Sequence, residues 1–194
     1  MTSLESALQR MAADLARSGV DFALIGGLAV SVRTEPRFTR DADFAVAVSG
    51  DAEAETLIRR LRECGYEVTA LVEQEAVGRL ATVRLALAGD AGGPVMDLLF
   101  ASSGIEQEVV AEAELIELLP GLRVKVAGVA HLIALKVLAR DDVQRPQDLV
   151  DLRALLRTAT PVDVARAREA LGLITTRGFH RRRELVPQLE SLLG

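Results

Sequence analysis

The sequence predicts an α+β fold, with a mixed β-sheet flanked by helices and followed by a helical C-terminal part. Short apolar runs bounded by turn residues crowd the first two thirds of the chain, from residue 22 to residue 126. From residue 129 onward, the apolar residues instead recur at helical spacing. Strands that precede a run of helices are typical of α+β folds. We therefore expect a core over residues 1–127 and a helical part over residues 128–194 that packs on this core.

The expected elements follow from apolar spacing and from the residues that start and stop helices. Helices are expected at residues 3–18, 28–33, 51–63, 105–113, 129–140, 145–157, from 160 onward, and about 180–193. Strands are expected at residues 22–25, 39–48, 66–71, 80–87, 94–100, 114–119 and 122–126. Pro36 stops the second helix, and Gly65 caps the third. Thr160 is expected as an N-cap, with Pro161 at the first helical position.

Composition limits the class of protein. A chain of 194 residues that is 49% hydrophobic and 26% charged is expected to form one soluble domain with a substantial core. No apolar run approaches the roughly 20 residues that span a bilayer, and the first residues do not resemble a signal peptide. We therefore expect a cytoplasmic protein with no membrane partner. The single cysteine, Cys64, excludes an internal disulfide and a multi-cysteine zinc site.

Charge and aromatic content bear on nucleic-acid binding. The net charge of −5 gives no general attraction to a phosphate backbone. Five Phe, one Tyr and no Trp make an aromatic base-stacking platform unexpected. The one dense basic cluster is formed by Arg177 and the run Arg181-Arg182-Arg183. It is either a solvated helix start or a local track for an RNA acceptor.

The stretch from residue 26 to residue 43 carries the candidate chemistry. Side chains alternate along a strand, so Arg37, Thr39, Asp41 and Asp43 share one face if the extended chain begins near residue 37. Two carboxylates one strand repeat apart repel each other unless a cation lies between them. Hard oxygen ligands on a rigid strand suit Mg²⁺, which also binds substrate phosphates. A solvated strand edge is the alternative interpretation.

Two glycines precede these acids at an expected strand-to-helix turn. Gly26-Gly27 lets the backbone approach a ligand closely, and a helix N-terminus binds phosphate readily. The pair lacks the Gly patterns of dinucleotide-binding and P-loop sites, so neither of those is predicted. A tight turn without a ligand is the alternative.

Further candidates lie later in the chain. Asp97 interrupts an apolar run, where an ionised carboxylate is costly unless it is paired or metal-bound. Lys136 is the only Lys or Arg within the otherwise apolar segment 129–138, so we expect it to reach towards an active cleft or an acid. Asp148 and Asp151 share one helix face, where they can pair with Lys136 or Arg140; a purely structural salt bridge is the alternative interpretation.

The order Gly-Gly, Arg-x-Thr-x-Asp-x-Asp and a later strand-borne Asp resembles the signature of the DNA polymerase β-type nucleotidyltransferase superfamily. Within it, the sequence is most similar to the AbiEii-type branch of nucleotidyltransferase toxins, over about residues 24–151. Lys136 followed by Asp148-x-x-Asp151 is similar to a second motif of that branch. The chain departs from this motif at Gln147, where a Lys is usual.

The resemblance implies a polymerase β-like fold and Mg²⁺-dependent transfer of a nucleoside monophosphate from an NTP to an acceptor. Two Mg²⁺ ions would be held by Asp41, Asp43 and Asp97, with Lys136 completing the catalytic set. The nucleotide would be bound by Gly26, Gly27, Arg37 and Thr39. The second motif would comprise Arg140, Asp148 and Asp151.

The resemblance also implies a toxin of a toxin–antitoxin system, with tRNA or a protein as acceptor and a cognate antitoxin as partner. Two other functions stay open. One is an antibiotic or other small-molecule nucleotidyltransferase on the same scaffold. The other is a catalytically weak nucleotide-binding protein that acts through a regulatory partner.

Overall fold

A computed structural model describes residues 3–74, 78–90 and 92–194 of the chain; the remaining residues of the predicted core, 1, 2, 75–77 and 91, lie outside the described residues. The strands are β1 Asp21–Ile25, β2 Ala42–Ala47, β3 Tyr66–Gln74, β4 Arg79–Leu87, β5 Met96–Leu99, β6 Glu114–Leu119 and β7 Leu122–Val126. The helices are α1 Ser3–Arg17, α2 Gly26–Arg33, α3 Asp51–Glu63, α4 Glu106–Ala111, α5 Val129–Ala139, α6 Pro146–Thr158, α7 Pro161–Thr176 and α8 Leu185–Leu193.

The described strands form one seven-stranded sheet in the order β3-β4-β5-β2-β1-β7-β6. β2 pairs with β1 antiparallel and with β5 parallel, and β1 pairs with β7 parallel. The remaining neighbours are antiparallel. The sheet is therefore mixed, which confirms the predicted α+β class. β2 and β1 stand near its centre, where Phe44 is fully buried.

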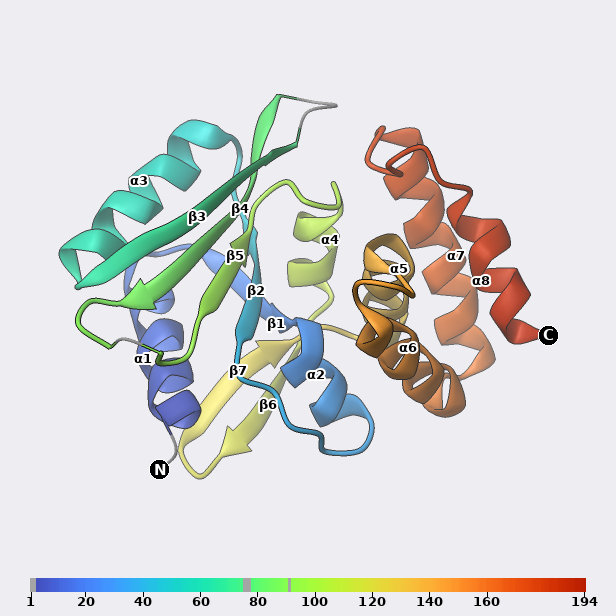
Figure 1. Ribbon diagram of the computed structural model, residues 1–194, viewed down its shortest axis with the longest axis horizontal. Coiled ribbons are helices and arrows are strands. Elements are labelled where there is room, and N and C mark those ends of the chain that lie inside the picture. Colours follow the sequence, from blue (N-terminus) through green and yellow to red (C-terminus); the bar gives the residue numbers. More distant parts are fainter. Residues whose placement is uncertain (1–2, 75–77, 91) are drawn as a thin grey trace.

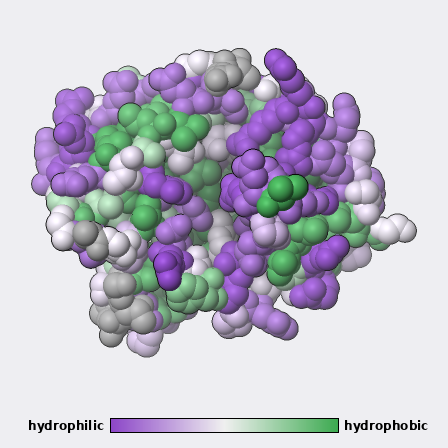
Figure 2. Space-filling view, viewed as in Figure 1, coloured by the Kyte–Doolittle hydropathy of each residue, from purple (hydrophilic) through white to green (hydrophobic). Residues whose placement is uncertain are grey.

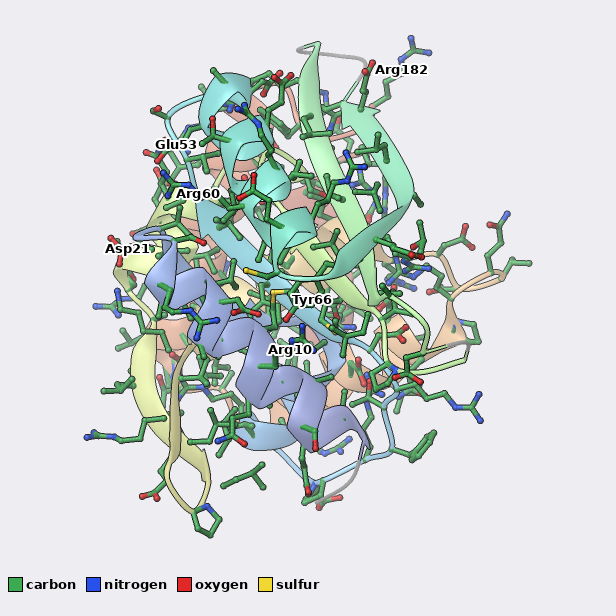
Figure 3. All side chains as sticks on the ribbon, turned by 90° about the vertical axis from the view of Figure 1, so that its left-hand side faces the viewer. Arg10, Asp21, Glu53, Arg60, Tyr66 and Arg182 are labelled. Atoms are coloured by element: carbon green, nitrogen blue, oxygen red, sulfur yellow. The ribbon has the colours of Figure 1, made fainter. Side chains whose placement is uncertain are left out.

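Helices cover the sheet and continue beyond it (Figure 1). α1 and α3 lie beside the strands in the left-hand part of the view, and α5–α8 gather in the right-hand part. Tyr66 at the start of β3 binds α1 to the sheet, because its hydroxyl donates a hydrogen bond to the buried Asp14 carboxylate at 2.9 Å. Arg10 of α1 lies over the same ring, as Figure 3 shows. These polar contacts secure a helix that otherwise buries Leu8, Met11 and Leu15.

The C-terminal helices are built around α5, which is apolar on almost all sides and is packed against α6, α7 and α8. α5 and α6 also contact α2, so the helical part meets the sheet at the element that follows β1. α7 starts as predicted: the Thr160 hydroxyl accepts from the Asp163 N–H, and the Asp163 carboxylate accepts from the Thr160 N–H. The division at residue 127 into two parts stays a prediction.

Two expected boundaries are wrong. β2 begins at Ala42 rather than at residue 39, because its pairing with β5 starts only at Met96. Residues 34–41 therefore form a loop, and the strand alternation expected from residue 37 does not apply to them. α8 begins at Leu185 rather than near residue 180, because Arg181 and Arg182 have left-handed backbone angles that a helix cannot contain.

No helix in the part of the chain that the structure describes is both long and apolar enough to cross a bilayer. The cytoplasmic location stays a prediction.

Candidate active site

A row of three charged side chains crosses the sheet. Arg84 of β4 lies opposite Asp97 of β5, and Asp97 lies opposite Asp43 of β2. Residues that are directly opposite in neighbouring strands project from the same face, so these side chains are neighbours. We call Arg84, Asp97 and Asp43 the sheet row. On the other side of Asp43, the neighbouring strand β1 places its last residue, Ile25, opposite Asp43. α2 begins directly after Ile25.

The sheet row opens into a cavity of about 870 Å³ between the strands, the start of α2 and the C-terminal helices. Figure 2 shows the hollow near the middle of the molecule, with hydrophilic residues around it. The predicted residues that line the cavity are Gly26, Gly27, Arg37, Thr39, Asp41, Asp43, Asp97, Lys136 and Asp148. Segments far apart in the sequence therefore bring nearly all of the predicted site to one place. Asp151 and Arg140 do not line it: Asp151 contacts the lining residues Arg37 and Lys136, and Arg140 binds Asp142.

The surroundings of Asp43 disfavour the charged form of its carboxyl group. Burial raises the pKa of Asp43 to about 6, and the charge of Asp97 adds to the shift, while Lys136 opposes it. Among the described residues, no donor makes a hydrogen bond to the Asp43 carboxylate. An acid that is buried beside another acid without a direct partner is a place where a cation binds favourably.

The first turn of α2 lies against this acid. Gly26 has a φ of 65°, and a Cβ there would overlap the Asp43 carboxylate. A Cβ on Gly27 would overlap the Arg37 guanidinium. No side chain caps the α2 N-terminus, and its first turn has no acidic residue. The glycines are therefore required for close packing, and the uncapped N–H groups of α2 are suited to an anion.

Asp97 is held by Arg84, a residue that the sequence interpretation missed. Arg84 Nε donates to Asp97 Oδ1 at 2.8 Å and Nη2 donates to Oδ2 at 2.7 Å, so the pair is bidentate. These hydrogen bonds raise the pKa of Arg84 above its ordinary value. A charged residue within an expected apolar strand was the only available sign, because the strand register that joins Arg84 to Asp97 is not written in the sequence.

A second group of charges lies where α5, α6 and the loop after α2 meet; we call Lys136, Asp148, Asp151 and Arg37 the Lys136 cluster. Lys136 Nζ lies 2.7 Å from both Asp148 Oδ1 and Asp151 Oδ2. Arg37 reaches Asp151 from the loop at 2.7 Å. Burial alone would raise the pKa of Asp151, but hydrogen bonds from Arg37, Lys136 and Gln147 outweigh it and lower that pKa.

The structure bears on three expectations for the second motif, which concern Lys136, Arg140 and Gln147. Lys136 both lines the cavity and pairs with the two acids. Arg140 does not pair with them, because the chain leaves the helix at this residue and its guanidinium binds Asp142 at 2.5 and 2.6 Å. Gln147, where the second motif usually has Lys, donates to Asp151 at 3.0 Å.

Thr39 and Asp41 lie on the loop that leads into β2. The Thr39 hydroxyl lies 3.3 Å from the backbone carbonyl of Asp41, so it steadies the loop rather than an acid side chain. Arg145, which the sequence interpretation also left out, lines the cavity opposite and lies 3.0 Å from Asp148.

The basic cluster at the C-terminus is not one continuous track. Arg177 binds Glu108 at 2.6 Å and Arg183 donates to the Leu138 carbonyl at 2.9 Å. Arg181 lines the cavity, while Arg182 projects away from the body of the protein in Figure 3. Arg181 and Arg182 lie in a turn with left-handed backbone angles, before α8 begins at Leu185. Their side chains therefore do not line up on one helix face.

The donor set suits the implied Mg²⁺. Asp41, Asp43 and Asp97 supply only hard oxygen atoms, and the half-buried Asp43 carboxylate forms no ion pair with a described residue. Within residues 3–74, 78–90 and 92–194, no group of three or more His, Cys, Asp or Glu is already close enough to hold a metal ion. Arg84 occupies both oxygens of Asp97, so the third carboxylate is turned to a protein cation.

The fold defines a class of protein: it is a polymerase β-like nucleotidyltransferase fold, as predicted. The chain is similar to an antigenic nucleotidyltransferase-like protein from Paracoccidioides brasiliensis, with a TM-score of 0.56 and 18% identity over 97% of this chain and 92% of that one. It is also similar to ANT(2'')-Ia in complex with adenylyl-2''-tobramycin, with a TM-score of 0.56 and 16% identity over 91% and 99% of the two chains. The lincosamide antibiotic adenylyltransferase LnuA, lincomycin-bound, has a TM-score of 0.50 and 13% identity over 80% and 98%.

The family is shown by the sequence itself. The profile of the family described as nucleotidyl transferase AbiEii toxin, type IV TA system, matches residues 7–191. The chain belongs to this AbiEii nucleotidyltransferase toxin family, which confirms the resemblance seen in the motifs and supports an enzyme that transfers nucleotides. No curated protein matches the sequence.

Proposed function

We propose that the chain is a Mg²⁺-dependent nucleotidyltransferase that moves a nucleoside monophosphate from an NTP to an acceptor, as the toxin of a toxin–antitoxin pair. The observation that carries the proposal is the position of Asp43. This acid is half-buried without an ion pair to any described residue, lies opposite Asp97 and touches the first residue of α2. A divalent cation and a phosphate are the groups that this combination attracts.

The residues of the cavity then have separate tasks. Asp41 and Asp43 would hold two Mg²⁺ ions, and Asp97 would complete the acceptor-side ion. When bound, the ions neutralise charge on the triphosphate and make an acceptor hydroxyl more acidic. The N–H groups at Gly26 and Gly27 bind phosphate oxygens, and Thr39 and Arg37 border the nucleotide from the loop.

Bond changes during transfer follow from this placement. The acceptor oxygen attacks the α-phosphorus of the NTP, and the bond from that phosphorus to the bridging oxygen breaks, releasing pyrophosphate. Asp97, once Arg84 no longer binds it, would accept the proton of the attacking hydroxyl. Lys136, which lines the cavity and whose charge acts on Asp43, contributes positive charge to the transition state.

The family, rather than the cavity, supports the proposed acceptor. A toxin acts on a macromolecule, so tRNA or a protein is the proposed acceptor, and a cognate antitoxin is the proposed partner. A second candidate is a small-molecule acceptor, because the similar structure of ANT(2'')-Ia holds an adenylylated tobramycin.

Incubation with each α-³²P-labelled NTP and Mg²⁺ tests the proposal, with total tRNA, a protein extract or an aminoglycoside panel as acceptor. We expect label on one acceptor class, and none when Mg²⁺ is chelated. NTP binding without transfer would favour the regulatory, catalytically weak alternative. Absence of both Mg²⁺-dependent NTP binding and transfer would refute the proposed function.

A further inference from the structure

The Arg84–Asp97 pair uses the atoms that a metal ion needs. Both oxygens of Asp97 accept hydrogen bonds from the guanidinium, at 2.8 and 2.7 Å. A guanidinium in this fork geometry is the protein group that most closely matches a carboxylate. The fork uses one lone pair on each Asp97 oxygen and holds a positive charge against the carboxylate, so Mg²⁺ at Asp97 meets fewer free lone pairs and a like charge.

The pair is placed so that it can open. The Arg84 side chain is 47% exposed, whereas that of Asp97 is 13% exposed, so the arginine approaches from the solvent side of the cavity. Half-exposed ion pairs contribute little net stability, because water replaces the lost contacts. Arg84 can therefore leave Asp97 without unfolding of the strands that carry them.

The neighbouring acid has no such partner. Asp43 lies directly opposite Asp97 but accepts no hydrogen bond from the described residues. Arg84 thus compensates the charge of Asp97, whereas the charge of the adjacent Asp43 is left to an ion from solution. The sheet row is therefore occupied at Asp97 and open at Asp43.

We propose that Arg84 is an internal counter-ion that competes with the metal ion for Asp97, so that complete metal loading requires Arg84 to release this carboxylate. The inference rests on the proposed Mg²⁺-dependent function. A doubly charged ion that contacts both Asp43 and Asp97 replaces a singly charged group that contacts only Asp97, so the exchange favours the metal once it is present. Arg84 sets the metal concentration at which the site fills.

Mn²⁺ binding tests this competition, because free and bound Mn²⁺ are distinguished by electron paramagnetic resonance without any reaction. The variants are Arg84→Met, which removes the charge and the hydrogen bonds, and Arg84→Lys, which keeps the charge but loses the fork. Arg145→Met is the matched control, since Arg145 lines the same cavity and acts on Asp43 without contacting Asp97. Melting curves check that each variant folds.

We expect Arg84→Met to bind Mn²⁺ about three- to tenfold more tightly than the wild type, as loss of one competing ion pair implies. Arg84→Lys should fall between them, and Arg145→Met should change the affinity less than Arg84→Met does. Unchanged or weaker binding by folded Arg84→Met, or an equal gain in Arg145→Met, overturns the inference while leaving the metal site intact. If neither wild type nor Arg84→Met binds Mn²⁺ saturably, the proposed function fails as well.

Discussion

The sheet row and the Lys136 cluster contain the same kinds of side chains, yet the fold treats their acids differently. In the Lys136 cluster, Asp151 is only 1% exposed but contacts both Arg37 and Lys136. Its pKa is lowered, because these partners outweigh burial. In the sheet row, burial and a neighbouring acid raise the pKa of Asp43 to about 6.

This difference in pKa and in partners distinguishes acids that stabilise the fold from acids that are available to bind a ligand. A cluster in which each buried acid meets a cation stabilises a junction, here between α5, α6 and the loop after α2. A buried acid without a direct partner lowers the stability of the metal-free chain, and this is explained if a substrate or metal supplies the missing charge. Proximity to the cavity alone would not have distinguished them, since Asp148 and Lys136 also line it.

The largest expected effect is on catalysis at the sheet row. Asp43→Asn removes a metal-binding charge, so label transfer should fall at least about a thousandfold under conditions in which the wild type transfers. Asp142→Asn is the control, since Asp142 pairs with Arg140 outside the cavity. Wild-type transfer rates in Asp43→Asn would end the assignment of the sheet row as the metal site.

The largest expected effect on stability is at the Lys136 cluster. Lys136→Met leaves Asp148 and Asp151 buried with less compensation, so the free energy of unfolding should fall by about 3 kcal/mol. Lys125→Met, which breaks the exposed pair with Asp21, should cost less than about 1 kcal/mol. Urea denaturation of both variants gives the comparison, and similar losses would show that the cluster does not stabilise the junction.

The residues of the candidate site could be predicted because their types and order are local in the sequence. Gly26-Gly27, Asp41 and Asp43 stand close together, and the apolar strands on either side are evident from composition alone. The mixed sheet and the later helices followed from the change of apolar period near residue 129. These features depend on neighbouring residues rather than on distant contacts.

The partners of those residues could not be predicted in the same way. Arg84 meets Asp97 only because β4 and β5 pair in one register, and a shift of one residue would turn Arg84 to the other face. Arg37 was expected to share a face with the acids if the extended chain began near residue 37, but it lies on a loop, because the sheet offers that segment no pairing strand. Its contact with Asp151 joins residues 114 positions apart.

A pH series sharpens the contrast further. The pKa of Asp43 is raised from 3.8 to about 6, so the folded chain holds this proton more tightly than the unfolded chain. The stability that this carboxyl contributes is complete below about pH 4 and is lost as the pH rises through 6. In EDTA at pH 7.5, the free energy of unfolding of Asp43→Asn should therefore exceed that of the wild type by up to about 3 kcal/mol.

Near pH 4 that advantage should disappear, because both folded forms are then uncharged at this position. Asp142→Asn should show no gain at pH 7.5, since the Arg140 hydrogen bonds lower the pKa of Asp142. Unfolding free energies at several pH values are the measurement. An advantage of Asp43→Asn that does not change with pH would mean that ionisation is not its cause.

A further contrast in stability is expected between the two regions, at the start of α2. Gly26 touches Asp43 of the sheet row and has a left-handed φ, whereas Gly27 touches Arg37 of the Lys136 cluster and lies in ordinary helical backbone. Gly26→Ala is strained and should destabilise by about 1 kcal/mol or more. Gly27→Ala gains helix propensity but presses on the Arg37 guanidinium that binds Asp151, so it should destabilise, though less than Gly26→Ala, because a side-chain end can shift.

Substitution of Gly27 should affect nucleotide binding more than it affects stability. Gly27→Val places a branched side chain where the backbone must approach a phosphate, so titration calorimetry with Mg²⁺ and a non-hydrolysable NTP should show clearly weaker binding. Gly178→Val is a poor comparison because Gly178 has a positive φ, but Gly172→Val, in open space on α7, is a fair control and should bind normally. If Gly27→Val binds the nucleotide as the wild type does, the two glycines serve only the packing of Asp43 and Arg37, and the phosphate must be bound elsewhere in the cavity.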